Sequence, residues 1–290
     1  MITLFTTPKP FVGHAAIIQE NALRSWSLLG SGTRVVLFGN DAGTAEMAQK
    51  LGLEHRPDIA VNEYGTPTLD GLFDQAQRIS DHRLFCYVNA DILLLSDFVS
   101  SVVRAAQRKR RFLMVGLRRD VNINELLSFD SQWESSLRNM ALTQGKLQRP
   151  TAIDYFVFTR GLYDGLPPFA VGRTAWDNWM IYRARSLRVP VIDATDSVTC
   201  IHQNHDYNHT KQAPLTKDGS ASARRGYKWV WTGPEARRNF ALAGGVSHLY
   251  TIWDCTHTLG PDGLKQRDPG KGLGGGIWSY RRSSLYPLAG

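Results

Sequence analysis

The sequence predicts an α/β fold whose core is a doubly wound, mostly parallel sheet with helices on both faces. Short apolar runs alternate with segments of helical periodicity along the first part of the chain. The apolar runs are continuous, as in strands that are buried on both faces. With 290 residues and 42% hydrophobic content, the chain can bury a full core.

The first three elements are a strand, a helix and a strand. Residues 2–6 form an apolar run that precedes Pro8 and Pro10. Residues 14–29 place apolar side chains at helical spacing, and the glycines that follow end the helix. Residues 34–38 are apolar throughout after their first residue, which predicts a buried strand.

The alternation continues through the next four elements. Residues 44–51 predict a short helix that Gly52 closes, and residues 53–56 a short strand. A loop through residues 57–67 leads to a helix at residues 69–79. The strand at residues 84–88 then completes the predicted first half of the sheet.

The second half is less regular. We predict strands at residues 152–158, 189–193 and 198–201, and a helix that begins near residue 175. Residues 211–290 are expected to form a mobile loop at residues 211–226 followed by a C-terminal extension. Within the extension we predict a helix at residues 234–243 and irregular structure from Pro261.

Composition narrows the class of protein. Cys86, Cys200 and Cys255 lie far apart and lack C-x-x-C spacing, which argues against a disulfide framework and a structural zinc knuckle. The first residues read as a strand and not as a secretion signal, and no segment qualifies as a membrane span. These features favour a cytoplasmic protein.

The net charge of +8 and an isoelectric point near 9.5 suit phosphate-bearing partners. Residues 108–111 (Arg-Lys-Arg-Arg) follow a predicted helix, where they either complement the helix dipole or form a peripheral contact with an anionic membrane at the inner face. No RNA-binding signature occurs, so we expect no nucleic-acid partner.

Two metal-capable side chains, Asn89 and Asp91, follow the strand at residues 84–88. Residues two apart in an extended chain point the same way, and ligands of such sheets bind at the carboxyl ends of the strands. Oxygen donors suit Mg²⁺ or Mn²⁺. The alternative is an Asx turn that ends the strand without a metal.

Two further candidates lie at element ends in the second half. Asp177 falls in the first turn of a predicted helix, where its alternative role is a charge stabilised by the helix dipole. His202 follows the strand at residues 198–201, and its alternative is a histidine satisfied within a loop. His205 and His209 extend it to an H-x2-H-x3-H cluster, which would suit zinc if a fourth ligand were evident.

In their order, these motifs resemble those of nucleotide-sugar glycosyltransferases of the GT-A fold (family 2-like) over roughly residues 1–210. Residues 89–91 resemble the D-x-D metal motif, Gly172 the glycine-loop position, residues 176–177 the x-E-D motif, and His202 the late histidine of the metal site. Two positions depart from the pattern, because Asn replaces the first Asp of D-x-D and Trp precedes the last acid of x-E-D.

The resemblance implies a catalytic domain at residues 1–210 that transfers a sugar from a UDP- or GDP-sugar to a glycan or lipid-linked acceptor, as in polysaccharide biosynthesis. It implies Mn²⁺ or Mg²⁺ held by Asp91 and His202 with help from Asn89, to neutralise the diphosphate leaving group. It also implies that Asp177 is the general base of an inverting displacement.

Nucleotide contacts are expected where the first two strands end. Thr6 and Thr7 follow the first strand, and Asp41 follows the second, where its carboxylate can accept an N–H of uracil or guanine. The resemblance adds Gly172 to these donor-binding residues. For Asp41, the alternative is a plain turn residue.

Two rival functions remain. A nucleotidyltransferase on a related sheet would carry a glycine-rich basic loop after the first strand, and residues 6–10 (Thr-Thr-Pro-Lys-Pro) contain no glycine. A non-catalytic module for nucleic acid or anionic surfaces would explain the net charge, and it predicts salt-dependent binding that ignores substitution of Asp91.

Overall fold

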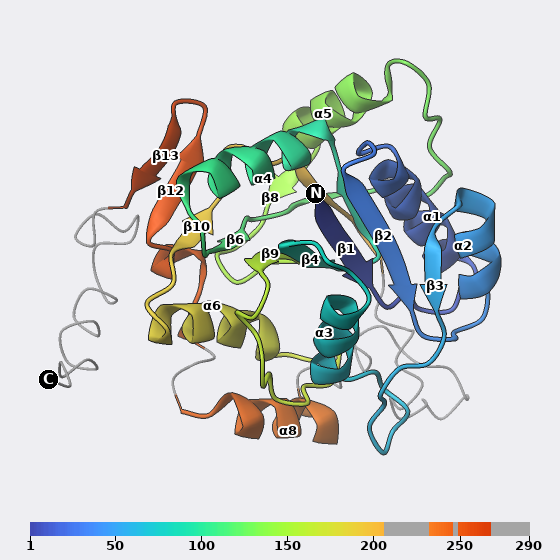
Figure 1. Ribbon diagram of the computed structural model, residues 1–290. Helices are drawn as coiled ribbons and strands as arrows, with labels where there is room; N and C mark the ends of the chain where they lie inside the picture. Colours follow the sequence, from blue (N-terminus) through green and yellow to red (C-terminus); the bar gives the residue numbers. More distant parts are fainter. Residues whose placement is uncertain (206–231, 246–248, 268–290) are drawn as a thin grey trace, which may run out of the picture.

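The computed structural model describes residues 1–205, 232–245 and 249–267 (Figure 1). The helices are α1 (His14–Ser27), α2 (Thr44–Leu51), α3 (Leu69–Arg78), α4 (Ser96–Arg108), α5 (Trp133–Thr143), α6 (Trp176–Ser186), α8 (Pro234–Ala243) and the 3-10 turn η2 (Ile252–Asp254). The mobile loop predicted at residues 211–226 lies outside the described residues.

A nine-stranded sheet forms the centre of the molecule. Its strands, in spatial order, are β13 (Gly263–Gln266), β12 (His257–Gly260), β10 (Val191–Asp193), β6 (Leu113–Val115), β9 (Tyr155–Thr159), β4 (Leu84–Val88), β1 (Ile2–Thr6), β2 (Thr33–Phe38) and β3 (Glu54–Arg56). Most neighbours are parallel, whereas β9 is antiparallel to both β4 and β6. The predicted α/β class with a mostly parallel sheet is confirmed.

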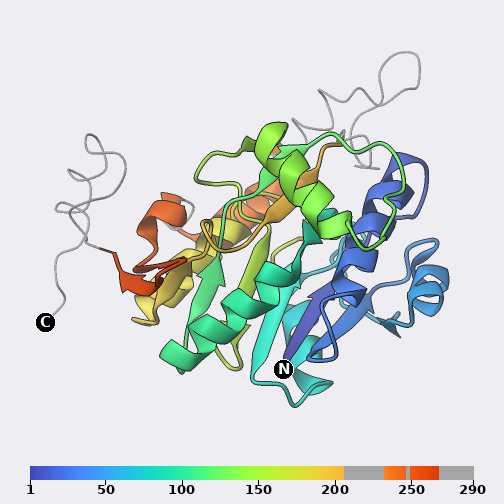
Figure 2. The same cartoon turned by 90° about the horizontal axis from the view of Figure 1, so that it is seen from above.

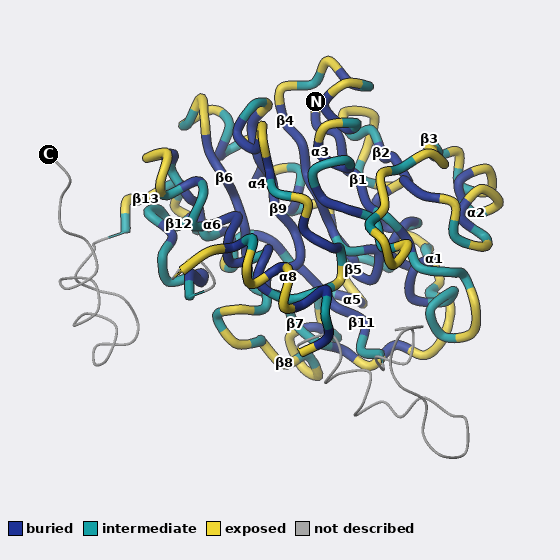
Figure 3. Tube along the Cα trace, turned by 90° about the horizontal axis from the view of Figure 1, so that it is seen from below, coloured by how far each residue is buried: buried dark blue, intermediate teal, exposed yellow. Residues whose placement is uncertain are grey.

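Side chains of the central strands alternate between two apolar layers. In β1, Leu4 packs on one face with Trp26 of α1 and Phe98 of α4, whereas Phe5 packs on the other face with Phe73 of α3. Viewed from above, α1, α4 and α5 lie on the nearer side of the sheet (Figure 2). The central strands β1, β4, β6 and β9 are buried along their length, while outward positions of α2 and α8 are exposed (Figure 3).

A second sheet of four strands was not predicted. Its order is β5 (Ile92–Leu94), β11 (Cys200–Gln203), β7 (Arg119–Val121) and β8 (Lys146–Leu147). The register places His202 opposite Ile92 on one side and Asp120 on the other. His202 therefore lies inside a strand and not after its end, because β11 extends to Gln203.

The chain beyond residue 210 contributes to the main sheet. Strands β12 and β13 form an antiparallel pair, and β12 lies parallel to β10 at one edge of the large sheet. The prediction of irregular structure from Pro261 is therefore wrong for Gly263–Gln266, while the predicted helix at residues 234–243 is confirmed as α8. Across the described ranges, no helix combines the length and the apolar character needed to cross a membrane.

Candidate active site

Residues 89–92 form a tight turn between β4 and β5. The N–H of Ile92 donates to the carbonyl of Asn89 over 3.1 Å. The Asn89 side chain does not cap this turn, because its amide nitrogen donates to Asp154 Oδ1 over 2.7 Å, and its main-chain N–H donates to the Asp154 carbonyl. The turn is therefore closed by a main-chain bond and is not the Asx turn expected as an alternative to a metal motif; it presents Asp91.

The main chain of Asp91 is held by Gln203, a fully buried residue of β11. Gln203 Nε2 and the Gln203 main-chain N–H donate to the Asp91 carbonyl over 3.2 and 3.3 Å. The carboxylate then faces two histidines: Oδ2 lies 3.0 Å from His205 Nε2 and 4.0 Å from His202 Nε2. The three ligand atoms of Asp91, His202 and His205 all lie within 4.8 Å of one another.

A second layer of charges supports this cluster. Asp120 Oδ1 lies 3.2 Å from His202 Nδ1, on the ring nitrogen that does not face Asp91. Arg118 donates to Asp120 over 2.9 Å and to both carboxylate oxygens of Asp154 over 2.9 and 3.0 Å. Basic and acidic side chains therefore alternate from the histidines through Asp120 and Arg118 to Asp154.

The electrostatics of the cluster keep the carboxylates ionised. Burial alone would raise the pKa of Asp91, but the hydrogen bond from His205 and the charges of His202, His205 and Lys9 outweigh burial and lower the pKa well below its usual range. The pKa of Asp120 is also lowered, because contacts with His202 and Arg118 outweigh the effect of burial. Ionised carboxylates are the form that binds a cation.

The cluster fits a divalent cation by two observations. Asp91 Oδ1 is buried and accepts no hydrogen bond among the described residues, so a strong acceptor is left for a ligand. One carboxylate with two imidazoles is a mixed donor set, which suits Mn²⁺ better than Mg²⁺, whose sites are dominated by oxygen. The same set also suits Zn²⁺, for which these residues supply three ligands.

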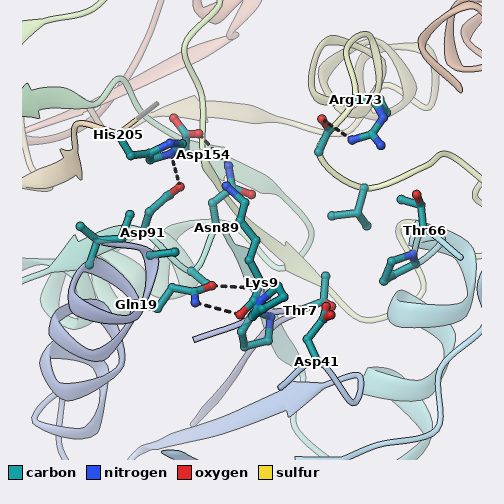
Figure 4. Close-up of a pocket in the computed structure, with 18 of the residues that line it drawn as sticks. Thr7, Lys9, Gln19, Asp41, Thr66, Asn89, Asp91, Asp154, Arg173 and His205 are labelled. Atoms are coloured by element: carbon teal, nitrogen blue, oxygen red, sulfur yellow. Dashed lines mark hydrogen bonds and ion pairs between the residues drawn. The ribbon is translucent and has the colours of Figure 1, made fainter. Parts of the chain in front are cut away.

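The cluster lies in the wall of a cavity of about 380 Å³, within the range of small-molecule sites. Thr7 and Asp41 line the cavity after β1 and β2, at the same carboxyl edge as Asp91 (Figure 4). Gly172 and Arg173 line it from the loop before α6. Lys9, Asn89 and His202 also line the cavity, and Tyr64 and Tyr87 add aromatic surface. The lining therefore combines acidic, basic and aromatic side chains.

The cavity brings together most of the site residues predicted from the sequence. Thr7, Asp41, Asn89, Asp91, Gly172 and His202 all line it. Thr6 does not: it is fully buried within β1. Gly172 adopts φ +69°, a backbone conformation that favours glycine. A Cβ there would meet no atom within 4 Å, so the conformation and not a lack of space favours glycine.

Asp177 lies in the first turn of α6 and is not part of the cavity lining. Burial raises the pKa of its carboxyl to about 7, partly offset by the N–H of Asn178 and reinforced by the charge of Asp154. Its Oδ1 is buried without a hydrogen bond from any described residue. Asp177 is thus a carboxyl with a pKa near neutral that lies outside the cavity lining, within electrostatic range of the cavity residue Asp154.

Helix α8 holds two adjacent segments of the cavity lining, residues 64–66 and 171–173. Glu235, 1% exposed, accepts two hydrogen bonds from Arg173 over 2.9 and 2.6 Å and one from Asn62 over 2.8 Å. The side-chain oxygen Oδ1 of Asn62 in turn accepts from the N–H groups of Tyr64 and Thr66, which also line the cavity. Asn239 of the same helix bonds both main-chain groups of Ala170.

Several of these residues were not predicted. Asp154 precedes a buried strand, and its position at the site follows only because β9 is antiparallel to β4. The pairing of Asp120 with His202 depends on the unpredicted small sheet. His205 was singled out in a histidine cluster, and that spacing was the one available signal for a third ligand.

No protein-family model matches the sequence, and neither does any curated protein. Among solved structures, the chain is similar to S. aureus TarS in complex with UDP-GlcNAc (TM-score 0.49, 11% identity, 74% of this chain and 62% of that chain). It is also similar to glucosyl-3-phosphoglycerate synthase from Mycobacterium tuberculosis in complex with Mg²⁺ and uridine diphosphate (TM-score 0.43, 15% identity, 71% of this chain and 72% of that chain). The chain thus spans less than two thirds of the TarS chain.

Proposed function

We propose that this protein transfers a sugar from a nucleoside-diphosphate sugar, a UDP- or GDP-sugar, to an acceptor hydroxyl with the help of a divalent cation. The observation that carries the proposal is the convergence of Asp91, His202 and His205 in the wall of a nucleotide-sized cavity. The cavity lies at the carboxyl edge of β1, β2 and β4, where open α/β sheets bind their ligands.

The cation would be held by Asp91, His202 and His205, and Asn89 remains a proposed fourth contact beside them. A bound divalent ion supplies positive charge that stabilises a diphosphate leaving group. The two imidazoles favour Mn²⁺ over Mg²⁺ as the ion. The Asp120 carboxylate would orient His202 through the ring nitrogen that is turned away from the ion.

The nucleoside would occupy the end of the cavity formed by Thr7 and Asp41. A carboxylate there can accept an N–H from a uracil or guanine ring, and a threonine hydroxyl can bond a ribose or a base. Both side chains follow strands β1 and β2, which pair in register, so they lie at one edge of the sheet. Gly172 lines the cavity from the loop before α6 and remains a proposed donor contact.

Asp177 is the proposed general base, which would make the transfer inverting. A pKa of about 7 suits this role, because a base with a pKa near the working pH can take the acceptor's proton and release it again. The acceptor class remains the prediction drawn from the resemblance, a glycan or a lipid-linked hydroxyl. A peripheral contact of residues 108–111 with an anionic membrane is likewise a prediction.

The proposal is tested by calorimetric titration of nucleoside diphosphates and their sugars into the protein with Mn²⁺, Mg²⁺, Zn²⁺ or chelator. We expect metal-dependent binding of either the uridine or the guanosine series. A bound nucleotide should also raise the free energy of unfolding by about 2.7 kcal/mol when its concentration is about 100 times its dissociation constant. Asp91→Ala should abolish the metal dependence. Asp74→Ala is the matched control, since Asp74 forms an exposed pair with Arg78 and does not line the cavity.

Three other outcomes are informative. Binding of Zn²⁺ alone, with no binding of any nucleotide, would indicate that the metal site serves a reaction other than sugar transfer. Salt-dependent binding of anionic polymers that is unchanged in Asp91→Ala would support the non-catalytic module instead. Hydrolysis or transfer of the sugar, detected by release of the nucleoside diphosphate, would complete the case for a transferase.

A further inference from the structure

The loop between β1 and α1 is fixed by a buried side chain. Gln19 of α1 is 2% exposed, and both ends of its amide are bonded to the main chain of Lys9. The Lys9 N–H donates to Gln19 Oε1 over 2.6 Å, and Gln19 Nε2 donates to the Lys9 carbonyl over 2.9 Å. Figure 4 shows this two-point bracket, with Lys9 lying between Thr7 and Asp91 in the view.

The bracket has a consequence for anion binding. Loops that cradle phosphate usually do so with main-chain N–H groups. Pro8 and Pro10 have none, and the N–H of Lys9 is already bonded to Gln19. Residues 8–10 can therefore contribute to anion binding only through the Lys9 ammonium group.

Lys9 is suitably placed for that task. It lines the same cavity as Thr7, Asp41 and Asp91, between the proposed nucleoside end and the metal cluster. Its charge acts on Asp91, which places the ammonium group near the cluster.

We propose that Lys9 binds the diphosphate of the donor between the nucleoside end of the cavity and the metal cluster, and that Gln19 is a positioning residue that fixes Lys9 for this contact. The inference rests on the proposed function, since it assigns a residue to the diphosphate of that donor. A fixed loop lowers the entropy lost when the lysine engages a phosphate. An ammonium–phosphate contact is a charge-assisted hydrogen bond, stronger than a neutral one.

The test compares three ligands that differ only in phosphate number: uridine diphosphate, uridine monophosphate and uridine, or the guanosine series if the wild type selects it. Calorimetric titration is run at constant ionic strength with Mn²⁺. We expect Lys9→Met to weaken diphosphate binding by about tenfold or more, monophosphate binding less, and nucleoside binding not at all. Lys9→Arg should restore most of the diphosphate affinity.

A charge-matched control is Lys265→Met, since Lys265 is exposed on β13, pairs with Asp262 and lies outside the cavity lining. Gln19 is tested by a double-mutant cycle. As a single substitution, Gln19→Met should weaken diphosphate binding. In the background of Lys9→Met it should cause little further loss of affinity, because its effect passes through Lys9. Additive losses in the cycle would overturn the positioning role.

The outcomes separate this inference from the function on which it rests. If the wild type binds the diphosphate and Lys9→Met binds it as tightly as Lys265→Met does, the lysine assignment is overturned and the proposed function stands. If the wild type binds no nucleoside diphosphate under any metal condition, both fail together. Circular dichroism and the unfolding midpoint of each variant verify that the compared proteins are folded.

Discussion

Asp120 Oδ1 lies 3.2 Å from Nδ1 of His202, and the other nitrogen of the same ring faces Asp91. A carboxylate in this position orients a metal-binding imidazole and makes it a better donor. We predict that Asp120→Asn lowers Mn²⁺ affinity by about 10- to 100-fold. Asp262→Asn, on an exposed residue, is the control, and an unchanged metal dissociation constant in Asp120→Asn would refute the supporting role.

The buried pair of Glu235 and Arg173 should contribute strongly to stability. Glu235 is 1% exposed, so removal of its carboxylate takes the charged partner from a nearly buried guanidinium. We predict that Glu235→Ala lowers the free energy of unfolding by about 3–5 kcal/mol. The control is Glu63→Ala. Glu63 forms an exposed ion pair with Arg238, which lies in α8 like Glu235, and its loss should shift the denaturant midpoint far less.

Asp177 should make stability depend on pH. The folded carboxyl has a pKa of about 7 against an ordinary value of 3.8, so the folded state holds a proton that the unfolded chain releases. The stability that this proton provides is fully present below about pH 4 and is lost as pH rises through about 7. Asp177→Asn should remove that loss, measured as the difference in unfolding free energy between about pH 5 and pH 8.

If Asp177 is the general base, the transfer rate has the opposite trend. The base must be ionised, so the rate should rise with pH through about 7 while stability falls. Asp177→Asn should abolish transfer and keep the wild-type affinity for the nucleoside diphosphate. Transfer that persists in the variant would exclude Asp177 as the base.

Thr6 and Thr7 are adjacent in sequence but differ in placement. Thr6 Oγ1 is buried and bonded to no described residue, so Thr6→Val should leave stability and nucleotide affinity nearly unchanged. Thr7 lines the cavity, and Thr7→Val should weaken nucleotide binding by about 2- to 12-fold, the range for a lost neutral hydrogen bond. Equal affinities in the two variants would remove Thr7 from the nucleotide contacts.

The sequence predicted the elements whose signals are local. The strand at residues 84–88 and the helices at residues 44–51 and 234–243 occur as predicted, because apolar runs, glycine stops and helical spacing act within each segment. The placement of Asp91 after β4 follows from the same local pattern. Strand direction is not a local property, so the antiparallel course of β9 and the arrival of Asp154 at the site could not be derived.

The unpredicted residues of the site share one cause. Asp120, Gln203 and Glu235 reach their partners through contacts between distant segments, and no spacing in the sequence encodes such contacts. Gln203 illustrates this: its buried amide joins the carbonyl of Asp91 and that of Ile18 in α1. A lone glutamine beside a histidine carries no signal of that role.

The attachment of α8 to two segments of the cavity lining also determines when the site can form during synthesis. Domains fold from the N-terminus as the ribosome extends the chain. Strands β1 to β4 and the turn that carries Asp91 are made early, but Glu235 and Asn239 follow long after them. A nascent chain can therefore pair strands β1 to β4 first, and it completes the cavity only after α8 has left the ribosome.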